Sequence, residues 1–273
     1  MTFEDAYDAL LDRWGVPVER LDIGGTHVNA CGPLDAPPLV LLAGHGATSP
    51  VWFTVAPRLA ETHRVYAPDL PGDAGRSTAT PPRQVDDLMA WLTGVLDGLK
   101  VDQTALCGHS YGAWTALTFA LRNLDKVGRL ALVDPTDCFT GLRIPYIARA
   151  LPSLLRPSRE RTRSFLRWET QGLPVDEQWL ELAALAAEQP TAPFVRPKRP
   201  TDDQLRSLQP APLVFVAARS KSHDANRLTQ RVTTLIPAAT VVRVETATHH
   251  SLPVLHSDEV VNALTASEWS GQG

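Results

Sequence analysis

The chain has 273 residues, of which 44% are hydrophobic and 21% are charged. This length fits one large α/β domain or two smaller ones, and the apolar content is sufficient for a sizeable core. The formal net charge of −4 argues against nucleic acid as the main partner, because phosphate binding requires a basic surface.

The start of the chain and its cysteines bear on the cellular compartment. Residues 1–5 lack the basic and apolar regions of a signal peptide, and no apolar run is long enough to cross a bilayer. The three cysteines, Cys31, Cys107 and Cys138, cannot all pair, and none has the spacing of metal ligands. We therefore expect a cytoplasmic protein without a membrane span or a metal site.

Apolar periodicity predicts alternating helices and strands in the first half of the chain. Residues 3–14 form an amphipathic pattern, and residues 18–30 alternate around Gly24-Gly25 as in a hairpin. Apolar runs then predict further strands and helices. The strands cover residues 37–42, 64–68 and 130–133, and the helices cover 52–59 and 85–99.

The pattern changes between Thr136 and Gln209, where arginine and proline are frequent and the apolar periodicity is helical. We interpret residues 136–209 as a helical insertion in a core formed by residues 1–135 and 210–273. Alternation then resumes, with strands predicted over 213–217 and 240–244 and helices over 225–235 and 258–264. This order predicts an α/β fold with a mostly parallel sheet covered on both faces. Such sheets bind ligands beyond the carboxyl ends of their strands.

One motif carries the strongest chemical signal. Gly108-His109-Ser110-Tyr111-Gly112 lies between a predicted strand and a predicted helix, which is the context of a nucleophile elbow. The strained turn lifts the serine hydroxyl above the sheet edge, and its neighbours must lack bulk, as both glycines do. Ser110 is therefore the candidate nucleophile, and it needs a base to accept its proton.

With this elbow, the order of elements, the helical insertion and a late histidine, the chain resembles the α/β-hydrolase superfamily over nearly its whole length. Residues 201–260 are similar to its bacterial carboxylesterase-like members. The resemblance implies an α/β-hydrolase fold in which residues 136–209 form a helical cap. Where the family has Leu-Leu-His-Gly after the third strand, this chain has Leu41-Leu42-Ala43-Gly44. The match implies an oxyanion hole formed by the backbone N–H groups of His45 and Tyr111.

The base is expected in Thr246–Pro253, which contains two adjacent histidines. In the family this histidine follows the last strand and precedes the final helix by a fixed loop. Counting back from Glu259-Val260 favours His250 as the base. His249 is the alternative if the register differs by one residue.

The orienting acid departs from the family pattern. The usual aspartate lies three residues after a glycine that follows the next-to-last large strand, and here that register places Ser220 at the acid. Asp134 is the favoured substitute, because it ends the strand after the elbow helix, at the expected catalytic edge. Asp224 is the alternative, four residues past the usual position. Asp137 is a third, weaker candidate.

These residues together predict acyl transfer. We expect a serine hydrolase of a small ester, lactone or thioester, working without cofactor or metal as a monomer or homodimer. Its partner would be a small-molecule substrate, with neither nucleic acid nor membrane. The same residues also suit a carbon–carbon bond hydrolase or lyase of a specialised metabolite, and the missing usual acid leaves open a non-catalytic ligand-binding homologue. Candidate walls of a substrate pocket are Trp52, Trp114 and Phe139.

Overall fold

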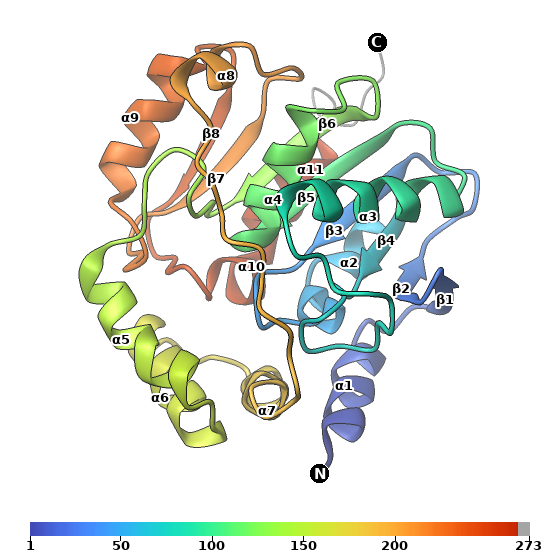
Figure 1. The fold of residues 1–273 in the computed structure, drawn as a ribbon, viewed down its shortest axis with the longest axis vertical. Coiled ribbons are helices and arrows are strands. Elements are labelled where there is room, and N and C mark those ends of the chain that lie inside the picture. The colour runs from blue at the N-terminus through green and yellow to red at the C-terminus, as the bar shows by residue number, and fades with distance from the viewer. Residues whose placement is uncertain (267–273) are drawn as a thin grey trace.

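An eight-stranded sheet with helices on both faces forms the centre of the computed structural model, which describes residues 1–266 (Figure 1). The strand order is β1-β2-β4-β3-β5-β6-β7-β8. The hairpin β1–β2 is antiparallel, β2 pairs antiparallel with β4, and the other neighbours pair in parallel. The predicted α/β-hydrolase fold is confirmed. The strands are β1 (Glu19–Ile23), β2 (Thr26–Cys31), β3 (Pro38–Leu42), β4 (Arg64–Pro68), β5 (Thr104–His109), β6 (Val127–Val133), β7 (Leu213–Ala217) and β8 (Thr240–Val244).

The sheet separates two hydrophobic cores. Successive side chains of a strand point to opposite faces, so Leu39 and Leu41 of β3 enter one core, and Val40 and Leu42 enter the other. The first core is covered by α1 (Phe3–Asp12), α2 (Ala56–Leu59) and α11 (Ser257–Thr265). The second is covered by α3 (Val85–Gly98), α4 (Tyr111–Ala120) and α9 (Ala225–Leu235).

Four helices lie between β6 and β7 in the chain: α5 (Ile144–Leu155), α6 (Arg159–Glu169), α7 (Glu177–Ala186) and α8 (Asp202–Arg206). Figure 1 shows α5, α6 and α7 together at one end of the molecule. Helix α8 instead packs beside α9, and its Leu205 is buried in the second core. No helix within residues 1–266 has the length and apolar character needed to cross a membrane.

The helix predicted over residues 52–59 is wrong in detail. Two short helices occupy this region, η1 (Ser49–Trp52) and α2, and each has a proline in its first turn. Proline has no backbone N–H and cannot continue a helix interior, so the two prolines start separate helices. A short helix just before α11, α10 (Leu252–Leu255), likewise has a proline, Pro253, in its first turn.

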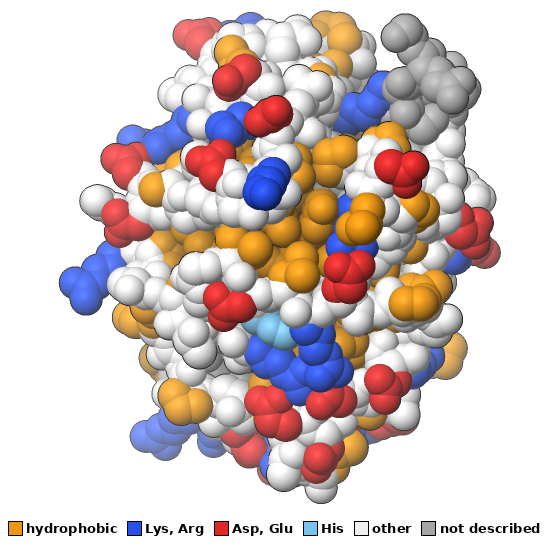
Figure 2. Space-filling model, turned by 90° about the vertical axis from the view of Figure 1, so that its right-hand side faces the viewer, with side chains coloured by type: hydrophobic (Ala, Val, Ile, Leu, Met, Phe, Trp, Pro, Cys, Tyr) orange, Lys and Arg blue, Asp and Glu red, His pale blue; other side chains and the backbone are white. Residues whose placement is uncertain are grey.

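Charges of both signs are interspersed on the face that carries β1 and β2 (Figure 2). Around α1, Arg76 pairs with Glu4 and Asp8, and Arg20 also pairs with Asp8. Arg20 and Arg76 on this face are therefore both paired with acids.

The turn at Ser110 has the strained geometry that the elbow motif predicts. Ser110 has φ 55° and ψ −114°, a region that side-chain-bearing residues rarely adopt. A Cβ atom on Gly108 would lie 2.2 Å from the Gly112 carbonyl oxygen, and one on Gly112 would lie 2.2 Å from the Leu42 oxygen. Both glycines are therefore required for the close approach of β5, α4 and β3.

This requirement predicts different effects for two glycine-to-alanine substitutions. Gly112→Ala should lower the free energy of unfolding by on the order of 3 kcal/mol, because the methyl group meets fixed backbone. Gly94→Ala in α3 is the matched control, since no heavy atom lies within 4 Å of its added Cβ. It should stabilise by up to about 1 kcal/mol through helix propensity. Urea unfolding measures both, and equal effects would contradict the steric argument.

Candidate active site

Three side chains from separate strand ends form a continuous hydrogen-bonded chain. Ser110 lies between β5 and α4, Asp134 follows β6, and His249 lies on the loop after β8. His249 Nε2 is 2.9 Å from Ser110 Oγ, and its Nδ1 is 2.6 Å from Asp134 Oδ2. The imidazole therefore bridges a hydroxyl and a carboxylate, which is the arrangement needed to accept a serine proton.

The histidine at Ser110 is His249, which corrects the prediction of His250. The His250 ring lies to one side, with Nε2 3.4 Å from the Tyr146 hydroxyl. The register differs because helix α10, absent from the predicted elements, lies between this loop and α11. A turn closed by Thr248 N donating to Ser251 Oγ, 2.8 Å long, precedes α10.

Asp134 is fully buried and accepts four hydrogen bonds. Oδ1 accepts from the Ala217 N–H (2.9 Å) and His223 Nε2 (2.8 Å), and Oδ2 accepts from Ser220 Oγ (2.9 Å) and His249 Nδ1. Burial alone would raise the pKa of Asp134, but the two histidines, His223 foremost, hold it well below its usual range. The group is therefore an ionised carboxylate.

The other acid candidates lie elsewhere. Asp224 caps α9, where its Oδ1 accepts the Arg227 N–H at 3.0 Å. Asp137 is partly buried near Arg199, and burial raises its pKa. Ser220, at the register where the family carries the acid, donates its hydroxyl proton to Asp134 instead. The structure therefore joins Asp134, rather than Asp224 or Asp137, to the histidine.

His223 is a second imidazole on the same carboxylate, and the sequence reasoning missed it. Burial alone would lower the pKa of His223, but the adjacent Asp134 carboxylate outweighs burial and raises it. Its Nδ1 atom is buried without a hydrogen-bond partner among residues 1–266. No spacing rule marks His223, because its contact with Asp134 joins positions 89 residues apart.

Glu169, at the C-terminal end of α6, holds the histidine loop by its backbone, and it was also missed. Its side chain has no solvent exposure and accepts three hydrogen bonds: from His249 N (3.0 Å), His250 N (3.0 Å) and Thr248 Oγ1 (3.1 Å). Two of the donors are backbone groups, which carry no signal in the sequence. Asp134 thus fixes the His249 ring while Glu169 fixes its main chain.

Two further imidazoles line the same loop in neutral form. His109 donates its Nε2 proton to the His249 carbonyl at 3.0 Å, and burial, together with His249, lowers its pKa to about 3. Burial and the neighbouring His249 and His109 also lower the pKa of His250. Both rings are therefore uncharged near neutral pH.

The predicted oxyanion groups flank Ser110. A Cβ on Gly44 would lie 3.3 Å from the Ser110 Cβ, so the loop leading to His45 passes beside the hydroxyl. Tyr111 directly follows Ser110 as the first residue of α4. The backbone N–H groups of His45 and Tyr111 have no hydrogen-bond acceptor within residues 1–266. The His45 imidazole is held by Asp73, whose Oδ2 lies 2.9 Å from Nδ1.

The three aromatic residues proposed as pocket walls occupy different places. Trp52 and Trp114 are completely buried in the two cores, so they provide packing and offer no surface to a substrate. Trp114 also donates its indole N–H to the Lys198 carbonyl. Phe139 is buried but lines a cavity next to α9. No group of three or more His, Cys, Asp or Glu side chains in the described residues is arranged to hold a metal ion.

The hydrogen bonds of Glu169 predict that Glu169→Gln frees the histidine loop. An amide has one acceptor oxygen, so at least one buried N–H loses its partner, at a cost of about 2 kcal/mol. Amide hydrogen exchange at His249 and His250 should then accelerate at least tenfold. Glu160→Gln, an exposed change on the same helix, is the control and should leave both amides protected. Unchanged protection in Glu169→Gln would contradict the assignment.

The shared carboxylate predicts a pH dependence of stability. Asp134 has a depressed pKa, so its stabilisation is present above pH about 4 and is lost as the pH falls through its folded value. His223 has a raised pKa, so its contribution is present below pH about 6.5 and is lost as the pH rises through its folded value. Asp134→Asn should therefore cost most, about 3 kcal/mol, between these limits. Urea unfolding from pH 3 to 8 tests this, and a loss independent of pH would contradict it.

Comparison with known proteins adds to this geometry. Residues 39–263 match the model of the alpha/beta hydrolase family. Carboxylesterase YbfK of Bacillus subtilis is 26% identical over 96% of this chain and 91% of its own length. The crystal structure of naproxen esterase from Bacillus subtilis superposes with a TM-score of 0.88 at 24% identity, covering 96% of this chain and 95% of that one.

A shorter match is to 2-hydroxy-6-oxo-2,4-heptadienoate hydrolase of Pseudomonas putida. It is 35% identical over 40% of this chain and 41% of that protein. The family match spans both sides of the helical insertion and includes the Ser110, Asp134 and His249 positions. The chain belongs to the alpha/beta hydrolase family.

Proposed function

We propose that this protein is a serine hydrolase that cleaves a small ester, lactone or thioester by acyl transfer. The observation that carries the proposal is the unbroken hydrogen-bonded chain from Ser110 Oγ through His249 to the Asp134 carboxylate. Full-length similarity to a protein named a carboxylesterase supports ester hydrolysis as the reaction.

The mechanism follows from the charges in this chain of contacts. Ser110 attacks the carbonyl carbon while His249 Nε2 takes its proton, and the ionised Asp134 stabilises the resulting imidazolium. The negative charge on the carbonyl oxygen is then bound by the N–H groups of His45 and Tyr111, which are worth roughly 3 kcal/mol each. His249 next protonates the leaving group and activates the water that releases the acyl group.

Residues 136–209 form the proposed cap and would control access to Ser110. Tyr146 of α5 lies with its ring 6.1 Å from the His249 ring, and Phe165 of α6 lies 6.0 Å from the His250 ring. These two helices therefore supply aromatic side chains at the histidine loop. The space between these aromatic side chains and the loop that carries His45 would then determine which substrate shapes fit.

The first test is labelling by a fluorophosphonate, which reacts with an activated serine. The wild-type protein should be labelled at Ser110, and Ser110→Ala should not. Hydrolysis of p-nitrophenyl acetate should fall in parallel. Absence of label on a folded wild-type protein would favour a non-catalytic ligand-binding homologue.

Adjacent histidines provide a matched pair of variants. His249→Ala should lower kcat for p-nitrophenyl acetate by at least about a thousandfold, because the serine loses its base. His250→Ala removes an identical side chain one residue away and should stay within about tenfold of the wild type. A larger loss of kcat in His250→Ala than in His249→Ala would mean that His250 is the base.

Carbon–carbon bond hydrolysis is the second candidate, favoured by the partial similarity to the Pseudomonas putida hydrolase. The same serine, histidine and oxyanion groups would serve that reaction. Comparing kcat/KM for p-nitrophenyl acetate and for 2-hydroxy-6-oxo-2,4-heptadienoate separates the two. A higher value for the dienoate would overturn the ester assignment.

A further inference from the structure

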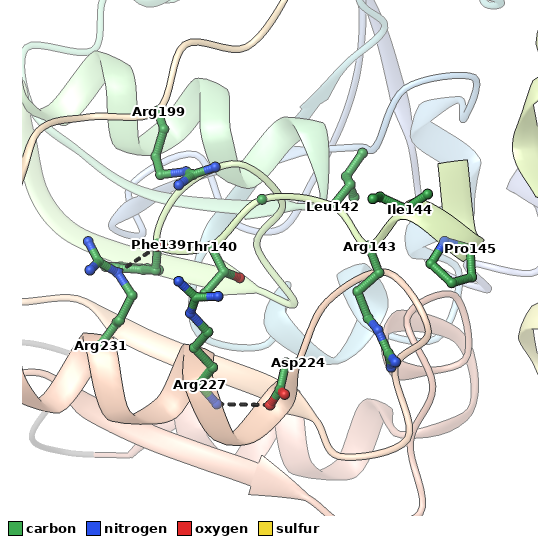
Figure 3. Close-up of a pocket in the computed structure, with 11 residues that line it drawn as sticks. Phe139, Thr140, Leu142, Arg143, Ile144, Pro145, Arg199, Asp224, Arg227 and Arg231 are labelled. Atoms are coloured by element: carbon green, nitrogen blue, oxygen red, sulfur yellow. Dashed lines mark hydrogen bonds between the residues drawn. The ribbon is translucent and has the colours of Figure 1, made fainter. Parts of the chain in front are cut away.

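A cavity of about 490 Å³ lies beside the start of α9, outside the Ser110 group (Figure 3). Its volume is in the range of small-molecule sites. The residues that line it come from three parts of the chain that are distant in sequence. They are residues 139–145 after β6, Arg199 before α8, and Asp224, Arg227 and Arg231 at α9.

Four arginines and a single carboxylate line this cavity. Arg231 is neutralised by Asp202 and also donates to the Phe139 carbonyl. Asp224 is occupied in capping α9. The guanidinium groups of Arg143 and Arg227 have neither an ion pair nor a hydrogen bond within residues 1–266. Arg199 also lacks an ion-pair contact there, and its nearest described carboxylate is the partly buried Asp137. Arginines elsewhere on the surface are commonly paired, as Arg163 is with Glu177 and Glu181.

The cavity wall also contains an unpaired polar group. Thr140 is 6% exposed, and its hydroxyl is buried without a hydrogen-bond partner in the described part of the chain. A buried hydroxyl without a partner costs free energy, which a ligand oxygen at this position would recover. Figure 3 shows Arg199, Arg227 and Arg231 around Phe139 and Thr140.

We propose that this cavity binds a small molecule carrying a phosphate group. Guanidinium groups present several N–H donors in a planar fork that matches phosphate oxygens, and Thr140 adds a hydroxyl donor. A phosphate has oxygens facing several directions and carries close to two charges, so it suits Arg199 and Arg227 together. The organic part of the ligand lies against the apolar side chains of Leu142, Ile144 and Pro145.

The site is separate from the proposed catalytic group but is linked to it through the loop after β7. Arg143 donates its backbone N–H to the Ser222 carbonyl at 2.8 Å, which ties the cavity rim to the loop that follows β7. That loop also carries Ser220 and His223, which bind Asp134. Occupation of the cavity would therefore steady this loop, while binding itself needs no reaction at Ser110.

Calorimetric titration of the full chain with inorganic pyrophosphate tests the proposal. The wild type should bind saturably at one site, and affinity should fall as ionic strength rises. Arg199→Gln and Arg227→Gln should each weaken binding at least tenfold, and Thr140→Val should weaken it severalfold. Thr140→Val keeps size and charge, so it remains informative if an arginine variant fails to fold.

Two controls separate this site from general surface charge and from the catalytic group. Arg196→Gln makes the same charge change at an exposed residue on the Arg199 segment, outside the cavity, and should leave the Kd within twofold. Ser110→Ala should also bind unchanged. The proposal is overturned by absence of saturable binding, by equal loss in Arg196→Gln, or by tighter binding of citrate than of pyrophosphate.

Discussion

The buried carboxylate of Asp134 is the constraint on which the sheet edge around Ser110 depends. An ionised group without solvent exposure is tolerated only when charged and polar partners surround it. Those partners come from the end of β7, from the loop that follows β7 and from the loop that follows β8. Satisfying one charge therefore fixes three segments relative to Ser110, and the ring orientation of His249 follows from it.

A second buried carboxylate, that of Glu169, also fixes the histidine loop. Glu169 belongs to α6, in the segment between β6 and β7, yet its hydrogen-bond partners are backbone groups of the histidine loop. The proposed cap is thus hydrogen-bonded to the loop that carries His249. A movement of α6 would break buried hydrogen bonds at His249, so the position of this helix and that of the histidine are coupled.

Features set by local geometry could be predicted from the sequence. The elbow at Ser110 could be predicted because glycines must flank the strained residue. Asp134 could be predicted because it directly follows a strand and so lies at the sheet edge. The single-residue error at His249 arose from α10, a helix too short to show periodicity. His223 and Glu169 escaped notice because their partners are distant in the chain. The sequence alone does not show whether Trp52 and Trp114 line a pocket or pack in the core, and the structure places both in the core.

In this chain the carboxylate that contacts His249 is Asp134 after β6, whereas the resemblance to the family places the acid after β7, at Ser220. Strands β6 and β7 are parallel neighbours, so their carboxyl ends lie at the same edge and either can present a carboxylate to the histidine. With the acid after β6, the position after β7 must not carry a second charge, because two adjacent carboxylates would raise the pKa of one. Ser220 fills that position with a donor, and its hydroxyl stabilises the charge on Asp134. Ser220 is thus a hydrogen-bond donor to the carboxylate that ends the neighbouring strand.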